Sequence, residues 1–247
     1  MKIEEFIYPN QQQLFNLLRK KFQGRALFVK GAFVLVQGVA PVMLVAHLDT
    51  VHKESVKTIC ASADGNVLMS PQGIGGDDRC GVYALVTAFD TAQVKPWLLF
   101  TCDEEVGGRG ADTFCVIHAQ GKFPTQLDEI KFIVEVDRRG ANDAVYYDCA
   151  NFDFEDYISG KGFITAQGSF SDISLIAPEL GVAAVNLSSG YYNAHTLHEY
   201  IVRSELERTI EKVVEMIHDA ALDDFPSFPY VDANAFELDY LPPFVDY

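Results

Sequence analysis

Three apolar runs in this chain lack the alternation of apolar and polar residues typical of half-exposed strands, and each run ends at an imidazole or a carboxylate. They are PVMLVAH at 41–47, WLLFTCDEE at 97–105 and FIVEVD at 132–137. Unalternated runs of this kind are typical of strands covered on both faces, and the helical stretches between them favour parallel pairing. The sequence therefore predicts an α/β fold with three α/β/α layers around a central mixed, largely parallel sheet.

The segments around these runs fit the same fold. Residues 9–22 have apolar positions at helical spacing behind Pro9 and Asn10, which predicts a capped amphipathic helix. Two hairpins are expected, one turning at Lys30-Gly31 and one at residues 64–66. A glycine-rich loop at 73–76 passes into a helix, and residues 204–222 show a clear amphipathic pattern.

Length and charge limit the classes of protein to consider. The chain has 247 residues, enough for one large domain, with 19 basic against 35 acidic residues and a net charge of −16. This balance disfavours nucleic acid and anionic membrane surfaces as partners. The first residues show no basic region followed by an apolar stretch, so we expect a cytoplasmic protein. The five cysteines form no Cys-x-x-Cys pair and are expected to be reduced thiols.

The composition changes near residue 223. We therefore expect one catalytic domain over 1–222 and a separate C-terminal tail over 223–247 that contains four prolines and many Phe and Tyr residues. Aromatic residues are scarce in disordered segments, and exposed apolar surface invites aggregation. The tail from 225 is accordingly expected to dock on the domain or on a neighbouring subunit.

Histidine and acidic side chains collect where the predicted strands end. Because the carboxyl ends of parallel strands meet at one edge, His47, Glu104, Glu105 and Asp137 should lie together. Such ligands suit Zn²⁺, with Mn²⁺ or Co²⁺ as substitutes, and a shared carboxylate can bridge two metals. Two metals about 3.5–4 Å apart can hold a hydroxide between them and polarise a carbonyl group. One of two adjacent glutamates can then bind metal while its neighbour acts as the base.

Five motifs in order, HLDTV, GGDDRCG, DEEVGG, EVD and GYYNAHTLHEY, resemble those of the co-catalytic dizinc exopeptidases. This family contains peptidase T, glutamate carboxypeptidase and bacterial leucyl aminopeptidase, and the resemblance covers about residues 42–202. It implies two zinc ions, the first bound by His47 and Asp137 and the second by Glu105 and His195, with Asp77 as the bridge. It further implies that Glu104 is the general base, that Asp49 orients His47, and that the Asp77–Asp78 peptide bond is cis.

The spacing of the motifs departs from the larger members of that family. Peptidase T-like members carry a lid domain between the last two ligands, but Asp137 and His195 are only 58 positions apart here. Another branch inserts a domain between the first histidine and the bridging aspartate, yet His47 and Asp77 are 30 positions apart. The resemblance therefore implies a compact, single-domain form without the lid.

Other reactive side chains have simpler interpretations. The remaining histidines have no carboxylate partner at ligand spacing and are expected to be structural: His52, His118, His198 and His218. Cys80 and Cys102 are expected to be small packing residues. Ser169 and Ser171 lack the G-x-S-x-G context of a hydrolase nucleophile.

Three hypotheses about function follow. The first is a zinc-dependent exopeptidase, an aminopeptidase or a di- or tripeptidase, acting on small peptides. The second is a metal-dependent deacylase or amidohydrolase of N-acyl amino acids. Arginine is suited to binding the free carboxylate of such a substrate, and four arginines lie near the motifs: Arg79, Arg109, Arg138 and Arg139. The third is a non-catalytic binding protein on the same fold. The sequence is compatible with either a monomer or a homo-oligomer.

Overall fold

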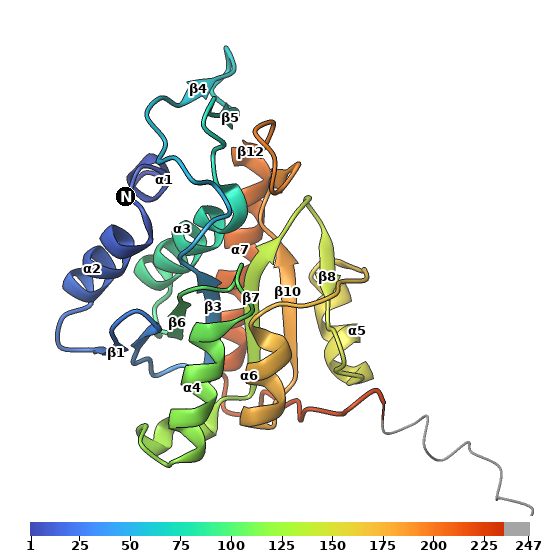
Figure 1. Ribbon diagram of the computed structural model, residues 1–247. Coiled ribbons are helices and arrows are strands. Elements are labelled where there is room, and N and C mark those ends of the chain that lie inside the picture. The colour runs from blue at the N-terminus through green and yellow to red at the C-terminus, as the bar shows by residue number, and fades with distance from the viewer. Residues whose placement is uncertain (235–247) are drawn as a thin grey trace, which may run out of the picture.

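The computed structural model describes residues 1–234, and its centre is a mixed sheet with the strand order β1-β2-β6-β3-β7-β10-β8-β9 (Figure 1). Its strands are β1 (Ala26–Val29), β2 (Phe33–Val36), β3 (Val42–His47), β6 (Trp97–Thr101), β7 (Phe132–Arg138), β8 (Asp143–Val145), β9 (Ile164–Thr165) and β10 (Ala184–Ser188). The central strands β6, β3, β7 and β10 are parallel, whereas β2 and β8 flank them in antiparallel pairing. The predicted mixed, largely parallel sheet is confirmed.

Helices cover both faces of this sheet. On one face pack α2 (Gln11–Lys21), α3 (Gly76–Thr91), α5 (Phe152–Gly160) and α7 (Arg203–Ala220), with the short α1 (Glu4–Ile7) against α3. On the other face pack α4 (Arg109–Ala119), α6 (Ile173–Leu180) and the 3-10 helix η1 (Thr125–Glu129), with α4 and α6 in front of the sheet in Figure 1. The three-layer prediction is confirmed, and the chain forms one compact domain.

The strand sequences explain why both faces are covered. Every residue of β2, β3 and β6 is buried. Successive side chains of a strand point to opposite faces, so Leu44 packs with α2, α3 and α7 while its neighbours Met43 and Val45 pack with α4 and α6. A strand that alternated apolar and polar residues would place polar side chains on one face, and the cluster on that face would lose its apolar contacts with the sheet.

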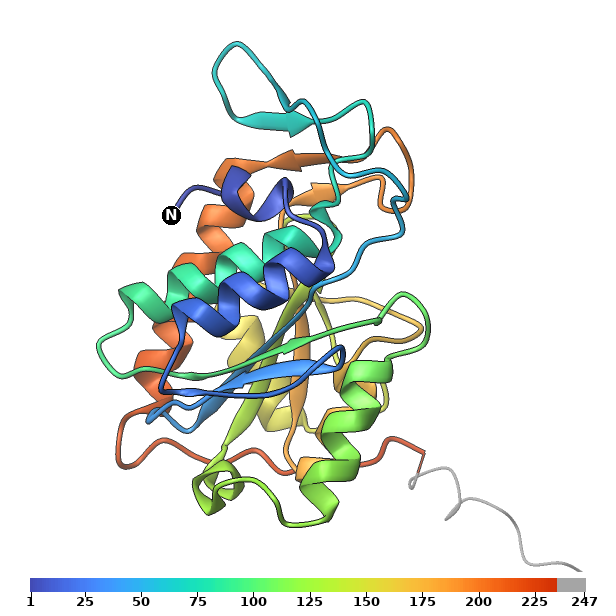
Figure 2. The same ribbon diagram turned by 60° about the vertical axis from the view of Figure 1, so that its left-hand side comes forward.

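A second, smaller sheet stands above the carboxyl ends of the central strands. Its order is β11-β12-β5-β4, formed by β4 (Cys60–Ala61), β5 (Val67–Met69), β11 (Tyr191–Tyr192) and β12 (Tyr200–Val202). Figure 2 shows the β4–β5 hairpin projecting from the main body. Both expected hairpins form, since β1 pairs with β2 and β4 with β5, each antiparallel. This sheet holds the 193–199 loop over the main sheet.

Two local predictions concern the ends of the domain. Helix α2 begins at a capping box in which Asn10 and Gln13 exchange side-chain and backbone hydrogen bonds, as the capped pattern predicted. At the C-terminal side, Phe228 is 5% exposed and its ring lies 5.1 Å from that of Phe154. The prediction for the rest of the tail, 235–247, lies outside the described residues. No helix within 1–234 combines the length and apolar character needed to cross a membrane.

Candidate metal centre

The candidate ligands gather at the carboxyl edge of the central strands. His47 is the last residue of β3, Asp137 lies at the end of β7, and Glu105 follows β6 in a tight turn. Because β6, β3 and β7 are parallel neighbours, these three side chains reach the same place. Asp77 enters from the start of α3, and His195 enters from the loop between β11 and β12. The structure thus brings together the five side chains that the resemblance implies as metal ligands.

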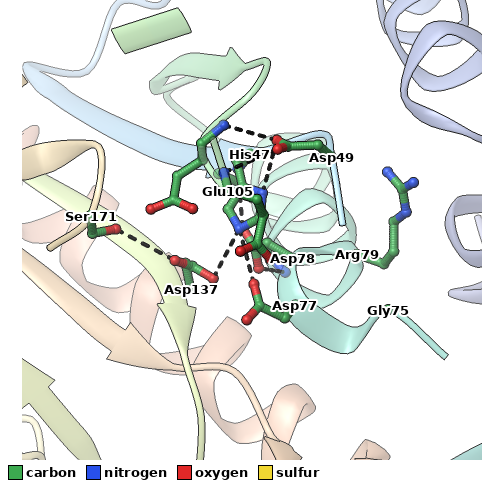
Figure 3. A network of polar contacts seen from close by, with 12 residues as sticks. His47, Asp49, Gly75, Asp77, Asp78, Arg79, Glu105, Asp137 and Ser171 are labelled. Carbon is green, nitrogen blue, oxygen red and sulfur yellow. Dashed lines mark hydrogen bonds and ion pairs between the residues drawn. The ribbon is translucent and has the colours of Figure 1, made fainter. Parts of the chain in front are cut away.

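Asp77 lies between the two histidines. Its Oδ1 is 3.0 Å from His47 Nε2, and its Oδ2 is 3.1 Å from His195 Nε2. A second carboxylate stands beside each imidazole: Asp137 Oδ1 lies 3.4 Å from His47 Nε2, and Glu105 Oε1 lies 3.2 Å from His195 Nε2. The result is two triads that share one carboxylate, and Figure 3 shows Asp77 and Asp137 converging below His47.

The donor atoms of these triads fit a pair of tetrahedral metal ions. Within each triad the donor atoms lie within 4.8 Å of one another. Metal bonds of about 2.0–2.1 Å at tetrahedral angles place neighbouring donor atoms about 3.3 Å apart, close to the distances around Asp77. Glu105 Oε1 is enclosed yet accepts no hydrogen bond from residues 1–234. An enclosed carboxylate oxygen without a donor is suited to a cation.

The electrostatics of the metal-free site favour the same interpretation. Burial, together with the charge of Asp77, raises the pKa of Asp137 well above its usual range and that of Glu105 to about 7. Burial alone would also raise the pKa of Asp77, but its hydrogen bonds with His195 and His47 hold that pKa well below the usual range. Three carboxylates share a small volume, so bound cations would relieve their mutual repulsion.

Asp49 supports both sides of the centre. Its Oδ1 lies 3.2 Å from His47 Nδ1, the nitrogen that faces away from the triads. The same carboxylate accepts the backbone N–H groups of Glu104 and Glu105, each at 3.1 Å. Asp49 therefore orients the imidazole and also fixes the turn that carries both glutamates.

The side chain of Glu104 is placed differently from that of Glu105. It is half-buried and forms no hydrogen bond or ion pair with any residue in 1–234. Burial raises the pKa of the Glu104 carboxyl. A free carboxylate with a raised pKa next to two metal triads has the properties of a proton acceptor.

Glu199 is a buried participant that the sequence did not indicate. It is fully buried, and its two oxygens accept the backbone N–H groups of Asp77 at 3.0 Å and of Gly75 at 2.8 Å. Glu199 Oε2 also lies 2.8 Å from His52 Nε2. The only available signal was its position four residues after His195, inside the last motif, which says nothing about its partners.

Two of the remaining histidines have carboxylate partners in the fold, although none stands at ligand spacing in the sequence. His52 contacts Glu199, and His118 Nδ1 lies 2.7 Å from Glu179 Oε1. These partners are 147 and 61 positions away along the chain. Both histidines nevertheless lie outside the metal triads.

Three more side chains support the ligands from behind. Asp78 is fully buried and accepts the backbone N–H of His47 at 3.2 Å. The hydroxyl of Tyr191 donates to the backbone carbonyl of Asp137 at 3.0 Å. Ser171 Oγ donates to Glu135 Oε2 at 2.5 Å and lies 3.4 Å from Asp137 Oδ2, which is a supporting contact and no nucleophile arrangement. The Asp77–Asp78 peptide bond is cis, as the resemblance implied.

Comparison with known proteins identifies the fold. The chain resembles a tripeptidase from Staphylococcus aureus, with a TM-score of 0.65 and 14% identity over 89% of this chain and 96% of that one. It also resembles the aminopeptidase PepT from Bacillus cereus (TM-score 0.64, 14% identity, 89% and 98% of the two chains). A TET aminopeptidase from a marine sediment archaeon gives a TM-score of 0.64 at 12% identity over 87% and 96%. No family model matches the sequence. No curated protein matches it either.

Proposed function

We propose that this protein is a two-metal exopeptidase that hydrolyses peptide bonds of small peptides. One observation carries the proposal: the two oxygens of Asp77 face two different histidines, and a second carboxylate stands beside each histidine. Its similarity in fold to aminopeptidases and tripeptidases supports it. In the proposed site, His47, Asp77 and Asp137 would hold one Zn²⁺, and Asp77, Glu105 and His195 would hold the other, with Mn²⁺ or Co²⁺ as substitutes.

The protein supplies the base and the positioning for this reaction. Two bound metal ions would polarise the scissile carbonyl and lower the pKa of a bound water towards about 7. Glu104 accepts a proton from the attacking water and returns it to the leaving amine, because its carboxylate has no other partner in residues 1–234. Asp49 keeps the His47 imidazole and the turn at Glu104 and Glu105 in place during this transfer.

A cavity beside His195 offers room for a short substrate. It has a volume of about 510 Å³ and is lined in part by Val51, Leu197 and His195, whose side chain is half exposed. The rest of the wall is largely polar and includes Lys53 and Glu54. Val51 and Leu197 suit an apolar residue of a peptide, and the carboxylates of the triads suit its free ammonium group. We therefore favour cleavage next to a free amino terminus.

The deacylase hypothesis uses the same metal chemistry and differs in the substrate. Among residues 1–234, none of Arg79, Arg109, Arg138 or Arg139 forms an ion pair with a member of the two triads. A substrate screen separates the two hypotheses. The protein loaded with two zinc equivalents should hydrolyse aminoacyl amides and tripeptides, lose this activity to a chelator, and regain it with Zn²⁺.

The same screen can reject the proposal. Turnover confined to N-acyl amino acids would establish the deacylase instead. Absence of turnover on every amide substrate, with two metal equivalents bound, would leave the non-catalytic binding protein. Asp77→Asn is the matched inactive control, because it keeps the side-chain volume and removes the shared negative charge.

Self-assembly and a cytoplasmic location belong to the same proposal. The TET1 peptidase of Pyrococcus horikoshii, which has a similar fold (TM-score 0.58, 13% identity), can assemble into a tetrahedron or a large octahedral shell. We propose a homo-oligomer for this chain as well. Size-exclusion chromatography with light scattering measures the molecular mass. A monomer at micromolar concentration would contradict the proposed homo-oligomer.

A further inference from the structure

A second cavity lies next to the metal centre without including it. Its volume is about 290 Å³, and its walls come from the start of α2, from the loops at 49–56 and 73–75, and from Arg79 of α3. Residues 52–54 line both this cavity and the one beside His195, so they stand between the two. None of the five residues in the metal triads lines the second cavity.

Arg79 gives this cavity its chemistry. The residue is only 5% exposed, and its Nη1 donates to the backbone carbonyl of Leu48. Within residues 1–234 no carboxylate oxygen lies within 4.0 Å of its guanidinium, and Nε and Nη2 have no hydrogen-bond partner. Neither nitrogen is among the fully enclosed polar atoms, so both open towards the cavity. Figure 3 shows the guanidinium pointing away from Asp77.

A guanidinium in this position needs an acceptor. It stays protonated at any physiological pH and carries five N–H donors. Removing a charged group from water without pairing it is costly. Among the described residues, the Leu48 carbonyl accepts a hydrogen bond from Nη1 of Arg79. Most of the guanidinium N–H donors are therefore left for a ligand in the cavity.

The wall holds two cations, Arg79 and Lys53, and two carboxylates, Asp49 and Glu54. The charge of Asp49 favours the protonated guanidinium, yet the free N–H donors in the wall belong to the two cations. Lys53 has no ion-pair partner within residues 1–234, whereas Glu54 is paired with Lys57 at 3.0 Å. Both oxygens of Asp49 are occupied by His47 and by the backbone at Glu104 and Glu105. The negative groups in the wall are therefore already satisfied.

Helix α2 adds a favourable dipole. Pro9, the N-cap Asn10 and the first helical residue Gln11 line the cavity, and the helix is 11 residues long. The capping box uses the backbone N–H groups of Asn10 and Gln13 and leaves those of Gln11 and Gln12. The first backbone N–H groups of a helix carry partial positive charge and attract anions. A buried guanidinium, an unpaired lysine and a helix N-terminus thus face one space from three separate elements.

We propose that this cavity binds a small oxyanion, a carboxylate or a phosphate, between Arg79, Lys53 and the start of α2. The site is separate from the metal centre, and the inference does not depend on the peptidase activity. Thr50 packs against Gly75 in the cavity wall, since its methyl carbon lies 2.9 Å from where a Cβ on Gly75 would stand. An oxyanion would satisfy the free donors of Arg79 with charge-assisted hydrogen bonds.

Calorimetric titration of the metal-loaded protein tests this site. Orthophosphate and succinate are titrated separately, at constant ionic strength, with chloride as the reference anion. At least one oxyanion should bind saturably. Arg79→Gln should weaken that binding by at least about tenfold, and Lys53→Ala by about two- to fivefold. Lys122→Ala is the matched control: it removes the same charge from an exposed lysine that neither lines the cavity nor pairs with a residue of its wall, and it should leave the affinity unchanged.

Comparison of the two anions identifies the ligand class, and comparison of variants locates the binding site. Tighter binding of orthophosphate assigns a phosphate ligand, and tighter binding of succinate assigns a carboxylate. Binding that survives His195→Ala supports a site apart from the metals. Binding that is lost in His195→Ala but retained in Arg79→Gln overturns the proposal, as does the absence of saturable binding. If Arg79→Gln does not fold, equal affinities of Lys53→Ala and Lys122→Ala overturn it.

Discussion

The carboxylate of Glu199 accepts the backbone N–H group of Asp77 at 3.0 Å, across 122 positions of the chain. Its second oxygen accepts the N–H of Gly75, and the whole side chain is buried. Glu199 therefore fixes the loop that places Asp77 between the two histidines, although it is not itself a member of either triad.

Replacement of Glu199 should destabilise the protein and its metal centre together. Glu199→Ala leaves two enclosed N–H groups without acceptors, which should lower the free energy of unfolding by about 2–5 kcal/mol. Urea denaturation of the metal-free protein measures this loss, and metal titration measures the accompanying fall in affinity. Glu199→Gln retains one acceptor oxygen and should lose less. Normal stability in Glu199→Ala would contradict the assigned role.

Glu104 and Glu105 should separate under mutation although they are adjacent and chemically identical. Glu104→Gln should keep both metals and reduce kcat by about 10²–10⁴-fold with KM changed little, as expected for loss of a general base. Glu105→Ala should lose one metal as well as activity. Elemental analysis beside turnover on the best substrate distinguishes them. If Glu104→Gln strips metal as thoroughly as Glu105→Ala, the roles are wrong.

Asp49 should act through its contact with His47. Asp49→Asn replaces an acceptor by a donor near the backbone N–H groups of Glu104 and Glu105, and it weakens the support of the imidazole. We expect a loss of about 10–100-fold in metal affinity or activity. Asp103→Asn is the matched control, because Asp103 contacts the side chain of Gln11 and no ligand. Equal effects of the two substitutions would exclude a specific role for Asp49.

Metal affinity should rise with pH between about 7 and about 9. Burial and the charge of Asp77 raise the pKa of Glu105 to about 7, and the hydrogen bond with Asp77 raises the pKa of His195 to about 9. Metal binds only the deprotonated ligands. Below these pKa values protons compete with metal for the ligand atoms, and as pH rises through them the protons dissociate and metal affinity increases. Competition with a chromophoric chelator at pH 6, 7, 8 and 9 measures the slope. The slope between 7 and 9 should become shallower in His195→Ala, which removes one of these titrating ligands.

The described part of the tail should contribute to stability. Phe228 packs against Phe132 and Phe154 with centroid distances of 6.1 and 5.1 Å. Phe228→Ala should cost about 3–5 kcal/mol in the free energy of unfolding. Phe152→Ala, at a position 71% exposed, should change it by less than about 0.5 kcal/mol.

Truncation after Asp224 removes Phe225 and Phe228 together and tests the wider prediction for residues 225–247. Loss of these aromatic contacts should lower the melting temperature and expose apolar surface on α5 and β7. Lower solubility or a changed oligomeric mass should accompany this loss. An unchanged mass, solubility and melting temperature would show that the tail does not dock.

The sequence by itself determined the fold class and the members of both triads. Short unalternated apolar runs separated by helical stretches are typical of parallel strands covered on both faces, and the ends of such strands meet at one sheet edge. The motifs then pointed to Asp77 and His195, which enter from outside the sheet. These signals are local, because periodicity and strand ends are properties of a few consecutive residues.

Only the tertiary structure decided which distant groups face one another. Glu199 with Asp77, His52 with Glu199 and Arg79 with its cavity depend on loops brought together by the small second sheet. A hydrogen bond between distant residues, or an unpaired donor, produces no repeating pattern in a sequence. Each polar residue taken alone is typical of an ordinary loop. Its role appears when folding removes water from the group and leaves the protein to supply the partner.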